Sequence, residues 1–388
     1  MLGPSVNGIA FLELQLSVRV PIIRPTMPPF EEIEQSLREV WGSGMLTVSK
    51  NVAGLEKEFA ARCGTSEAVA MSSCTSGLIL LLTALDLPAG GEVIVPAFTF
   101  AATAHGVVWN RLTPVFADCK RSDLTIDVES VRSRITERTV AIMATTIFGV
   151  PPDIDELVAL AEEHDLPLLL DSAQALGSTY KGQVMGGFGV GEVFSMSPTK
   201  VATACEAGVI TLNDSVLAEK LRRARDYGKA KDGQDMEFIG LSARLSEFHA
   251  IVARATLSHL DEYIAHRLAC IAKYQARLGG LTGVSFLETG DDRTTSCNYM
   301  VLRIGSDCAL SRDELYGALG QLGIQTKKYF YPAVHQQTAF RPMHDGIELP
   351  EAEAASAECL AIPLFGHMTE DTLELVCTAI IETLEAAS

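Results

Sequence analysis

Apolar and polar residues follow two different periods along the first half of the chain. The segment beginning at Phe30 has apolar residues at helical spacing and ends at a glycine, so it predicts an amphipathic helix; a second helix is predicted over Val52–Cys63. Short apolar runs then alternate with helical patterns: AVAMSS precedes SGLILLLTALDL, VIVPAF precedes FAATAHGVVW, and LPLLLD follows IDELVALAEEH. This alternation predicts an α/β fold whose mostly parallel central sheet is covered by helices on both faces.

The pattern changes in the second half of the chain. VFSMSP and AGVITLND predict two strands joined by a loop, and after Leu245 one long helical stretch runs to YQARL. CNYMVLRI, with helices expected over Ser311–Leu322 and Thr369–Ala386, predicts a smaller α+β unit. Because 388 residues exceed what one core normally serves, we expect an N-terminal extension (1–20), a large domain (21–250), and a bridging helix with a small C-terminal domain (251–388).

Composition excludes several classes of partner. A formal net charge of -18, with no run of Lys or Arg, argues against nucleic acid and against an anionic membrane surface. The nine cysteines never form a CxxC pair, which indicates reduced cytoplasmic thiols rather than a disulfide framework or a metal site. The apolar stretch Gly8–Leu16 contains Glu13 and is too short to span a bilayer, so we expect no export and a cytoplasmic protein.

Two candidate ligand-binding segments lie where predicted strands end, which is where open parallel sheets collect ligands. In MSSCTSGLILLL, hydroxyls and backbone N–H groups meet at a helix N-terminus and could cradle a phosphate; the alternative is simple N-capping by one Ser or Thr. At the end of VPAFTF, Phe98 and Phe100 could stack on a planar heteroaromatic ring, or they could pack in the core.

Two charged residues complete the pattern. Asp171 ends the apolar run LPLLLD, so its carboxylate is expected at the bottom of a pocket, where it needs a cationic partner; a helix N-cap is the alternative. A pyridinium nitrogen is such a partner, and holding it protonated lets pyridoxal phosphate draw electrons from a substrate. Lys200 follows Ser-Pro-Thr in a turn between strands, where desolvation can make its amine a nucleophile toward an aldehyde, although an isolated lysine is more often a surface residue.

These segments resemble the DegT/DnrJ/EryC1/StrS family of sugar aminotransferases. The resemblance rests on VPAFTFAATA, DSAQALGSTYKG, and FSMSPTK followed by EAGVITLND, and it extends from about Val20 to the C-terminus through GMLTVSKNVAGLEKEFA, GLSARLSEFHA and YPAVHQQTAF. It implies the aspartate-aminotransferase fold (fold type I) and a homodimer whose two active sites are each built by both subunits. It also implies pyridoxal 5'-phosphate as cofactor, with pyridoxamine phosphate as its second form.

Positions matched to the family give each ring-contacting residue an expected role. Lys200 looks like the catalytic lysine that carries the cofactor as a Schiff base. Asp171 matches the partner of the pyridine nitrogen, Gln174 a contact to the ring hydroxyl, and Phe100 the ring-stacking residue. Thr75, Ser76 and Ser195 match hydroxyls that bind the cofactor phosphate.

One expected phosphate contact departs from the family pattern. A Gly-x-Asn-x-Arg segment of relatives reaches across the dimer to the phosphate, and here the asparagine has become Ser242, whereas Arg244 keeps its place. Serine can still donate a hydrogen bond but reaches less far. A further set of residues lies in segments that resemble the family's substrate-facing loops, namely Thr47, Lys327, Tyr331 and His335.

The resemblance implies transfer of an amino group from L-glutamate to a nucleotide-linked keto-deoxysugar, in the biosynthesis of antibiotic or cell-surface deoxysugars. The SMSPTK variant favours carbon 4 of a dTDP-4-keto-6-deoxy-hexose, with carbon 3 as the alternative. A sugar dehydratase of the same fold has histidine in place of the lysine, so Lys200 counts against it. A non-catalytic sensor would be expected to lose Lys200 or Asp171, and both are present.

Overall fold

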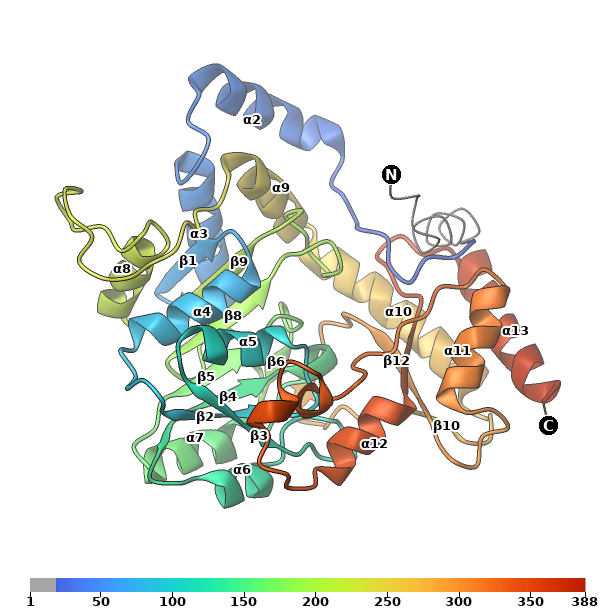
Figure 1. The fold of residues 1–388 in the computed structure, drawn as a ribbon. Helices are drawn as coiled ribbons and strands as arrows, with labels where there is room; N and C mark the ends of the chain where they lie inside the picture. Colours follow the sequence, from blue (N-terminus) through green and yellow to red (C-terminus); the bar gives the residue numbers. More distant parts are fainter. Residues whose placement is uncertain (1–18, 388) are drawn as a thin grey trace, which may run out of the picture.

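A seven-stranded sheet forms the centre of the molecule in the computed structural model, which describes residues 19–387 (Figure 1). The strand order is β1-β9-β8-β5-β4-β2-β3. Neighbouring strands from β8 to β3 run parallel, while β9 is antiparallel to both β8 and β1. The predicted α/β fold with a mostly parallel sheet is therefore confirmed. The strands are β1 (Glu67–Met71), β2 (Glu92–Pro96), β3 (Thr113–Ala117), β4 (Thr139–Thr145), β5 (Leu168–Asp171), β8 (Gly191–Ser195) and β9 (Gly208–Leu212).

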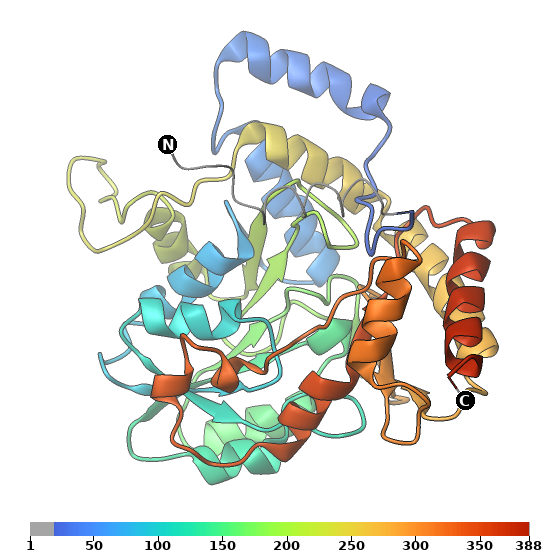
Figure 2. The same ribbon diagram turned by 45° about the vertical axis from the view of Figure 1, so that its right-hand side comes forward.

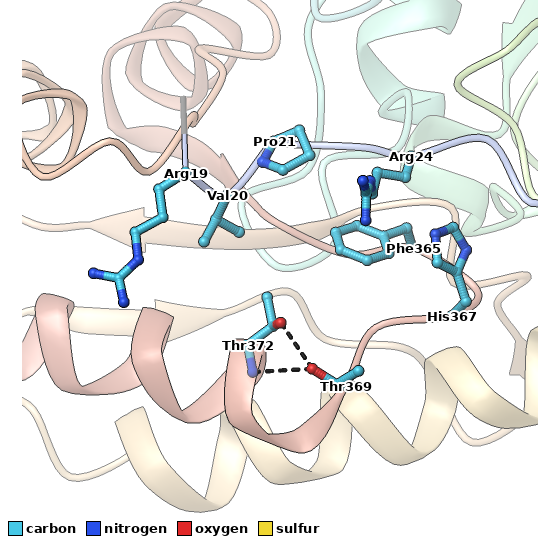
Figure 3. A pocket seen from close by; sticks show the side chains of 8 residues that line it. All are labelled: Arg19, Val20, Pro21, Arg24, Phe365, His367, Thr369 and Thr372. Carbon is cyan, nitrogen blue, oxygen red and sulfur yellow. Dashed lines mark hydrogen bonds between the residues drawn. The ribbon is translucent and has the colours of Figure 1, made fainter. Parts of the chain in front are cut away.

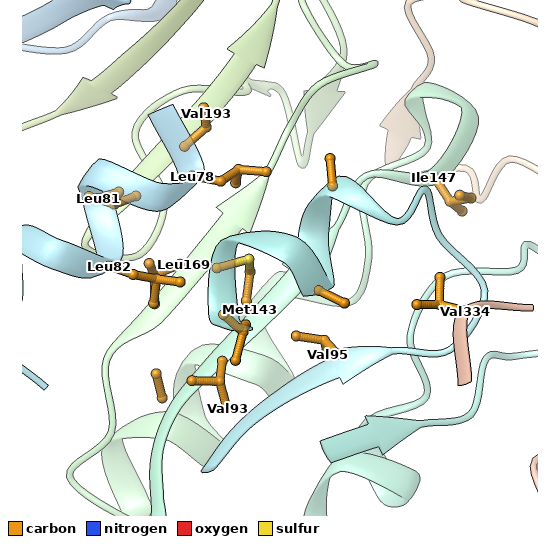
Figure 4. Close-up of a cluster of buried hydrophobic side chains, with 14 of the residues drawn as sticks. Leu78, Leu81, Leu82, Val93, Val95, Met143, Ile147, Leu169, Val193 and Val334 are labelled. Atoms are coloured by element: carbon orange, nitrogen blue, oxygen red, sulfur yellow. The ribbon is translucent and has the colours of Figure 1, made fainter. Parts of the chain in front are cut away.

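Helices cover both faces of this sheet, as its strands of continuous apolar residues require. One face carries α4 (Cys74–Ala84), α5 (Ala102–Trp109) and α8 (Ser215–Ala224). Figure 4 shows Leu82 of α4 beside Leu169 of β5, with Val93 and Val95 of β2 in the same cluster. The other face carries α3 (Lys50–Cys63), α6 (Val128–Arg134), α7 (Ile154–Glu163) and α9 (Glu247–Ser258). Each fully buried leucine or valine contributes roughly 1.5–3 kcal/mol.

Two glycines bring the start of α4 close to the sheet. A Cβ atom at Gly208 would lie 2.5 Å from the backbone nitrogen of Cys74, and a Cβ at Gly77 would lie 2.8 Å from Cγ1 of Val193. Neither contact is sterically possible, so only glycine permits this approach. The N-terminus of α4 is thereby held against β8 and β9, next to Ser195, which pairs with Gly208 in the sheet.

A smaller unit packs at one end of the sheet, as both ribbon views show (Figures 1 and 2). Its antiparallel strands are β10 (Val284–Phe286), β12 (Met300–Ile304) and β13 (Cys359–Ile362), and its helices are α10 (Leu260–Leu278), α11 (Arg312–Gln321) and α13 (Glu370–Glu385). Short strands β6 (Thr179–Tyr180), β7 (Gln183–Val184) and β11 (Arg293–Thr294) form a third sheet. The α+β character expected of the C-terminal region is confirmed.

The long helix expected after Leu245 is instead two helices, α9 and α10, which meet at His259. The break has a packing reason. Helix α9 lies on the large sheet, whereas α10 starts in the large core with Leu260 and ends in the core of the smaller unit with Tyr274. Tertiary packing thus divides a stretch whose sequence has one continuous helical pattern.

The two cores do not divide cleanly at residue 250. Residues Phe330, Val334, Phe340 and Leu349 come late in the chain, yet they pack with the large core, and Val334 is drawn among its side chains in Figure 4. Helix α12 (Pro350–Glu358) then leads back to β13 in the smaller unit. The chain therefore returns to the large core after β12 and enters the smaller unit again at β13.

Helix α2 (Phe30–Ser43) lies at the top of both ribbon views, above α9. It contacts α9 through Ile33 and Val40, and it ends at Gly44, whose φ of 68° confirms the predicted stop. Within residues 19–387 no helix is both long and apolar enough to cross a membrane. The expected N-terminal extension falls almost wholly outside the described residues.

Candidate active site

Asp171 supplies a buried carboxylate at the end of β5, with only 4% of its surface exposed. It accepts a hydrogen bond from Oγ1 of Thr103 at 2.7 Å and another from the backbone N–H of Ala173 at 3.2 Å. Burial raises the pKa of Asp171, against these hydrogen bonds and against the positive charge of Lys200. No cation within residues 19–387 forms an ion pair with it, so the site offers a buried acceptor for a positively charged group.

Lys200 approaches the same site from the loop between β8 and β9. The side chain is half-buried, and Nζ lies 5.7 Å from the centre of the Tyr299 ring, within the range of a cation–π contact. Its charge acts on both the Asp171 carboxylate and the thiol of Cys74. The amine therefore lies close enough to the carboxylate for their charges to interact.

A small cavity of about 10 Å³ lies beside Lys200. Gln174, Ser195 and Lys200 line it from the large domain, and Ser296 and Asn298 line it from the chain that leads into β12. Oε1 of Gln174 is buried with no hydrogen-bond partner among residues 19–387, while the buried amide of Asn298 lies beside the phenol of Tyr299. Buried polar atoms of this kind are costly unless a bound group satisfies them.

The N-terminus of α4 is capped by a serine and is also suited to binding a phosphate, so the two alternatives considered for its sequence are compatible. Ser73 caps the helix: its Oγ accepts from the N–H of Ser76 at 3.1 Å, and Oγ of Ser76 accepts from the N–H of Ser73 at 3.2 Å. Helix geometry leaves the N–H groups of Cys74 and Thr75 without intrahelical acceptors, and the helix dipole adds a partial positive charge. With Ser195 beside it, this end suits a phosphate.

The two candidate ring-stacking residues have different environments. Phe98 is fully buried and packs edge-on against Phe148 and Phe330, so the core alternative holds for it. Phe100 is 58% exposed, and its ring centroid lies 6.1 Å from that of Phe330. Its free face remains available for an aromatic ligand.

The segment 240–244, in which Ser242 stands where relatives have asparagine, lies on the surface. Ser242 is exposed, and its backbone pairs with that of Asp226. Nη1 of Arg244 lies 2.5 Å from Oδ1 of Asp226, and its guanidinium lies 5.4 Å from the centre of the Tyr227 ring. Arg244 is thus engaged within its own chain.

Three of the four expected substrate-facing residues, Thr47, Lys327 and Tyr331, are exposed. Nζ of Lys327 lies 5.8 Å from the Tyr329 ring. His335 does not share this exposure: its side chain is 2% exposed, and Nε2 lies 3.2 Å from Oε1 of Glu353.

His335 is packed within its own chain, and its expected contact with the substrate stays a prediction. Its ring packs against Phe116 and His344, and the contact with Glu353 satisfies one ring nitrogen. Burial lowers the pKa of His335, so the ring is kept neutral and serves the packing of this segment.

Several residues of the site carried no clear sequence signal. Thr103 supports Asp171, and its hydroxyl lies 3.0 Å from that of Thr99, four residues earlier in the chain. Glu192 lies behind the site and accepts hydrogen bonds from Oγ of Ser172 and from backbone N–H groups; burial raises its pKa to about 7. A carboxylate inside the apolar strand EVFS was the only hint of Glu192.

A separate cavity of about 350 Å³ lies in the smaller unit, between the start of the described chain and α13. Figure 3 shows Arg24 beside Phe365 and His367 at one end of it, and Arg19 directed toward the other end. Its lining includes neither Asp171 nor Lys200, so it is not part of the candidate active site.

Known proteins match this fold and sequence along nearly the whole chain. The model of the DegT/DnrJ/EryC1/StrS aminotransferase family matches residues 30–381. DesV of S. venezuelae, solved with a ketimine intermediate, is 32% identical; the match covers 95% of this chain and 99% of DesV, with a TM-score of 0.87. DesI, solved with its TDP-sugar product, is 29% identical over 95% of this chain and 94% of DesI (TM-score 0.89). The aminotransferase TlmJ of Streptoalloteichus hindustanus is 26% identical over 95% and 100% (TM-score 0.88).

Proposed function

The chain belongs to the DegT/DnrJ/EryC1/StrS aminotransferase family. From this premise we propose that it transfers an amino group from L-glutamate to carbon 4 of a dTDP-4-keto-6-deoxy-hexose. We propose that the reaction takes place in the cytoplasm. The chain is a sugar aminotransferase that depends on pyridoxal phosphate. The choice of carbon 4 is supported by the SMSPTK segment, and the choice of nucleotide by the TDP-sugar product of DesI. The observation that carries the proposal is the buried carboxylate of Asp171, with no ion-pair partner among residues 19–387, and the half-buried amine of Lys200 near enough for its charge to act on it.

The residues of the site fit this cofactor. Asp171 would bind the protonated pyridine nitrogen, because its carboxylate is buried without an ion-pair partner among the described residues. Gln174 would contact the ring hydroxyl, and Phe100 would cover one face of the ring. The free N–H groups at the start of α4, with Ser195, would bind the phosphate.

Lys200 is placed to move the protons of the reaction. Bound pyridoxal phosphate supplies an electron sink and carries the amino group between donor and acceptor. In the first half of the reaction, Nζ of Lys200 would remove the proton from the α-carbon of glutamate; in the second half, it would deliver a proton to the sugar carbon that receives the nitrogen. The nearby ring face of Tyr299 stabilises the protonated amine between these steps.

The surface supports a homodimer with shared active sites. Trp41 on α2 is 81% exposed, and Ile239 in the loop between α8 and α9 is 87% exposed, with Met45, Leu46 and Met236 also exposed nearby in the sequence. Apolar side chains in such numbers on protruding segments mark an interaction surface. Light scattering of the purified protein is expected to give twice the chain mass of 41.7 kDa. Measurement of a 41.7 kDa particle at micromolar concentration would contradict the shared site.

The reaction is tested by absorption and by analysis of the product. Protein loaded with pyridoxal phosphate should absorb in the violet, lose this band with L-glutamate, and recover it with a suitable keto-sugar nucleotide. NMR of the product from a panel of 3-keto and 4-keto nucleotides should place the new nitrogen on carbon 4. An unresponsive band would refute amino transfer from glutamate, and nitrogen on carbon 3 would refute the proposed position.

A further inference from the structure

The phenol of Tyr299, the residue directly before β12, lies near two positively charged side chains. Its side chain is 9% exposed, and Nζ of Lys200 lies 5.7 Å from the centre of its ring. Arg267 of α10 is 1% exposed, and Tyr299 is near enough for its charge to raise the pKa of this guanidinium, which burial lowers to about 10. Both cations belong to the same chain as Tyr299 and are in place without a partner subunit.

Three polar side chains approach the phenol oxygen of Tyr299 as hydrogen-bond donors, namely Thr199, Asn298 and Tyr329. The rings of Tyr299 and Tyr329 meet edge-on, with their centroids 4.9 Å apart. Burial and the neighbouring Tyr299 phenol raise the pKa of Tyr329, so Tyr329 keeps its proton and can donate it. An oxygen that receives several donors is better satisfied as a phenolate, which has no proton of its own to place, than as a phenol.

The charges around Tyr299 favour the same state. Burial opposes the ionisation of Tyr299, but the charge of Lys200 and the three donors outweigh it, so the pKa of Tyr299 lies below its ordinary value of 10. Nζ of Lys327 lies 5.8 Å from the Tyr329 ring and adds positive charge, whereas the carboxylate of Asp171 acts on Lys200. Because the charge of a phenolate spreads into its ring, Nζ of Lys200 meets that charge at the ring face.

We propose that Tyr299, as a phenolate, is the counter-ion that keeps the nitrogen of Lys200 protonated while this lysine carries the cofactor. The inference rests on the proposed function, and it adds a positioning residue that acts through Lys200. Asp171 would pair with the pyridine nitrogen, whereas Tyr299 faces the lysine nitrogen.

The counter-ion would prepare Lys200 for the entry of the amino donor. A protonated nitrogen withdraws electrons from the carbon to which it is bonded, so the neutral amine of glutamate attacks that carbon more readily. The attacking nitrogen forms the new bond and passes one of its protons to the nitrogen of Lys200. Lys200 then leaves as the neutral amine that the later proton transfers require.

The test is a pH titration of the loaded enzyme without substrate. The violet band reports the protonated nitrogen of Lys200, and it is lost when that nitrogen gives up its proton. Tyr299→Phe keeps the ring and removes the phenolate charge, so the midpoint of this transition should fall by roughly one to two pH units. Tyr316→Phe is the control, because Tyr316 is 40% exposed on α11, and its midpoint should equal that of wild type.

A second variant and a second measurement support this titration. Tyr329→Phe removes one donor to the Tyr299 oxygen, so its midpoint should fall by less than that of Tyr299→Phe. In the cofactor-free protein, one of the eight tyrosines should show phenolate absorption below the ordinary pKa of 10, and Tyr299→Phe should lack this component. Melting curves establish that each variant is folded.

A midpoint that is unchanged or higher in folded Tyr299→Phe would overturn the counter-ion role. Wild-type protein in which no tyrosine ionises below pH 10 would overturn it as well.

Failure of this inference differs from failure of the proposed function. The titration needs no substrate, so a midpoint that falls in Tyr299→Phe supports the counter-ion even where glutamate leaves the band unchanged, a result that refutes amino transfer alone. A band that responds to glutamate, with equal midpoints in wild type and Tyr299→Phe, would overturn only the role of Tyr299.

Discussion

Lys200→Ala is expected to reduce amino transfer by roughly 10,000-fold or more while leaving the fold and its thermal stability intact. The lysine would hold the cofactor and move both protons, so no neighbouring group replaces it. Its loss should not disturb the fold, because the contact of its Nζ with the Tyr299 ring is a single interaction of a half-buried side chain. The measurements are turnover with glutamate and a keto-sugar nucleotide, the violet absorption band, and the melting temperature.

Lys57→Ala is the matched control for this prediction, since Lys57 is an exposed lysine on α3. It should keep full turnover and the violet band. Lys200→Ala should lose the band yet still bind pyridoxamine phosphate, which needs no covalent link. Turnover above about one hundredth of wild type in Lys200→Ala would place the proton transfers on another residue.

The sequence predicted the sheet and the two charged residues of the site because these depend on local pattern. An uninterrupted apolar run that ends in a carboxylate specifies both a buried strand and the position of Asp171 at its edge. Lys200 was predicted for the same reason, since the strands on either side of it have strong apolar patterns.

The remaining differences arise from contacts between distant segments. His335 has the sequence signal of a substrate-facing residue, but Glu353 and the rings of Phe116 and His344 bury it. The break between α9 and α10 at His259 follows from packing on two cores, which no helical period records. Asn298 was missed because its position depends on Arg267.

Asp171→Asn is expected to lower amino transfer about a thousandfold, because removing one partner of a buried ion pair costs about 3–5 kcal/mol. Asparagine cannot hold the proton on the pyridine nitrogen, although it can keep the local hydrogen bonds: Oδ1 accepts from Ala173, and the hydroxyl of Thr103 can turn to accept from Nδ2. The loss should therefore appear in turnover rather than in the fold. The exposed Asp291 supplies the control variant Asp291→Asn, which should keep wild-type turnover.

The same substitution should stabilise the cofactor-free protein at pH 8. Burial raises the pKa of Asp171 above its ordinary value of 3.8. A carboxyl with a raised pKa favours the folded state at low pH, and this contribution disappears as the pH rises through the folded-state pKa. At pH 8 the wild type therefore bears the cost of a buried charge that Asp171→Asn lacks, and the difference in melting temperature should shrink toward pH 4. At pH 8, bound pyridoxal phosphate should make the wild type melt at a higher temperature than Asp171→Asn, because its pyridinium compensates the charge of Asp171 and has no such charge to meet in the variant. If cofactor-free Asp171→Asn instead melts below cofactor-free wild type at pH 8, the carboxylate is already compensated within the protein.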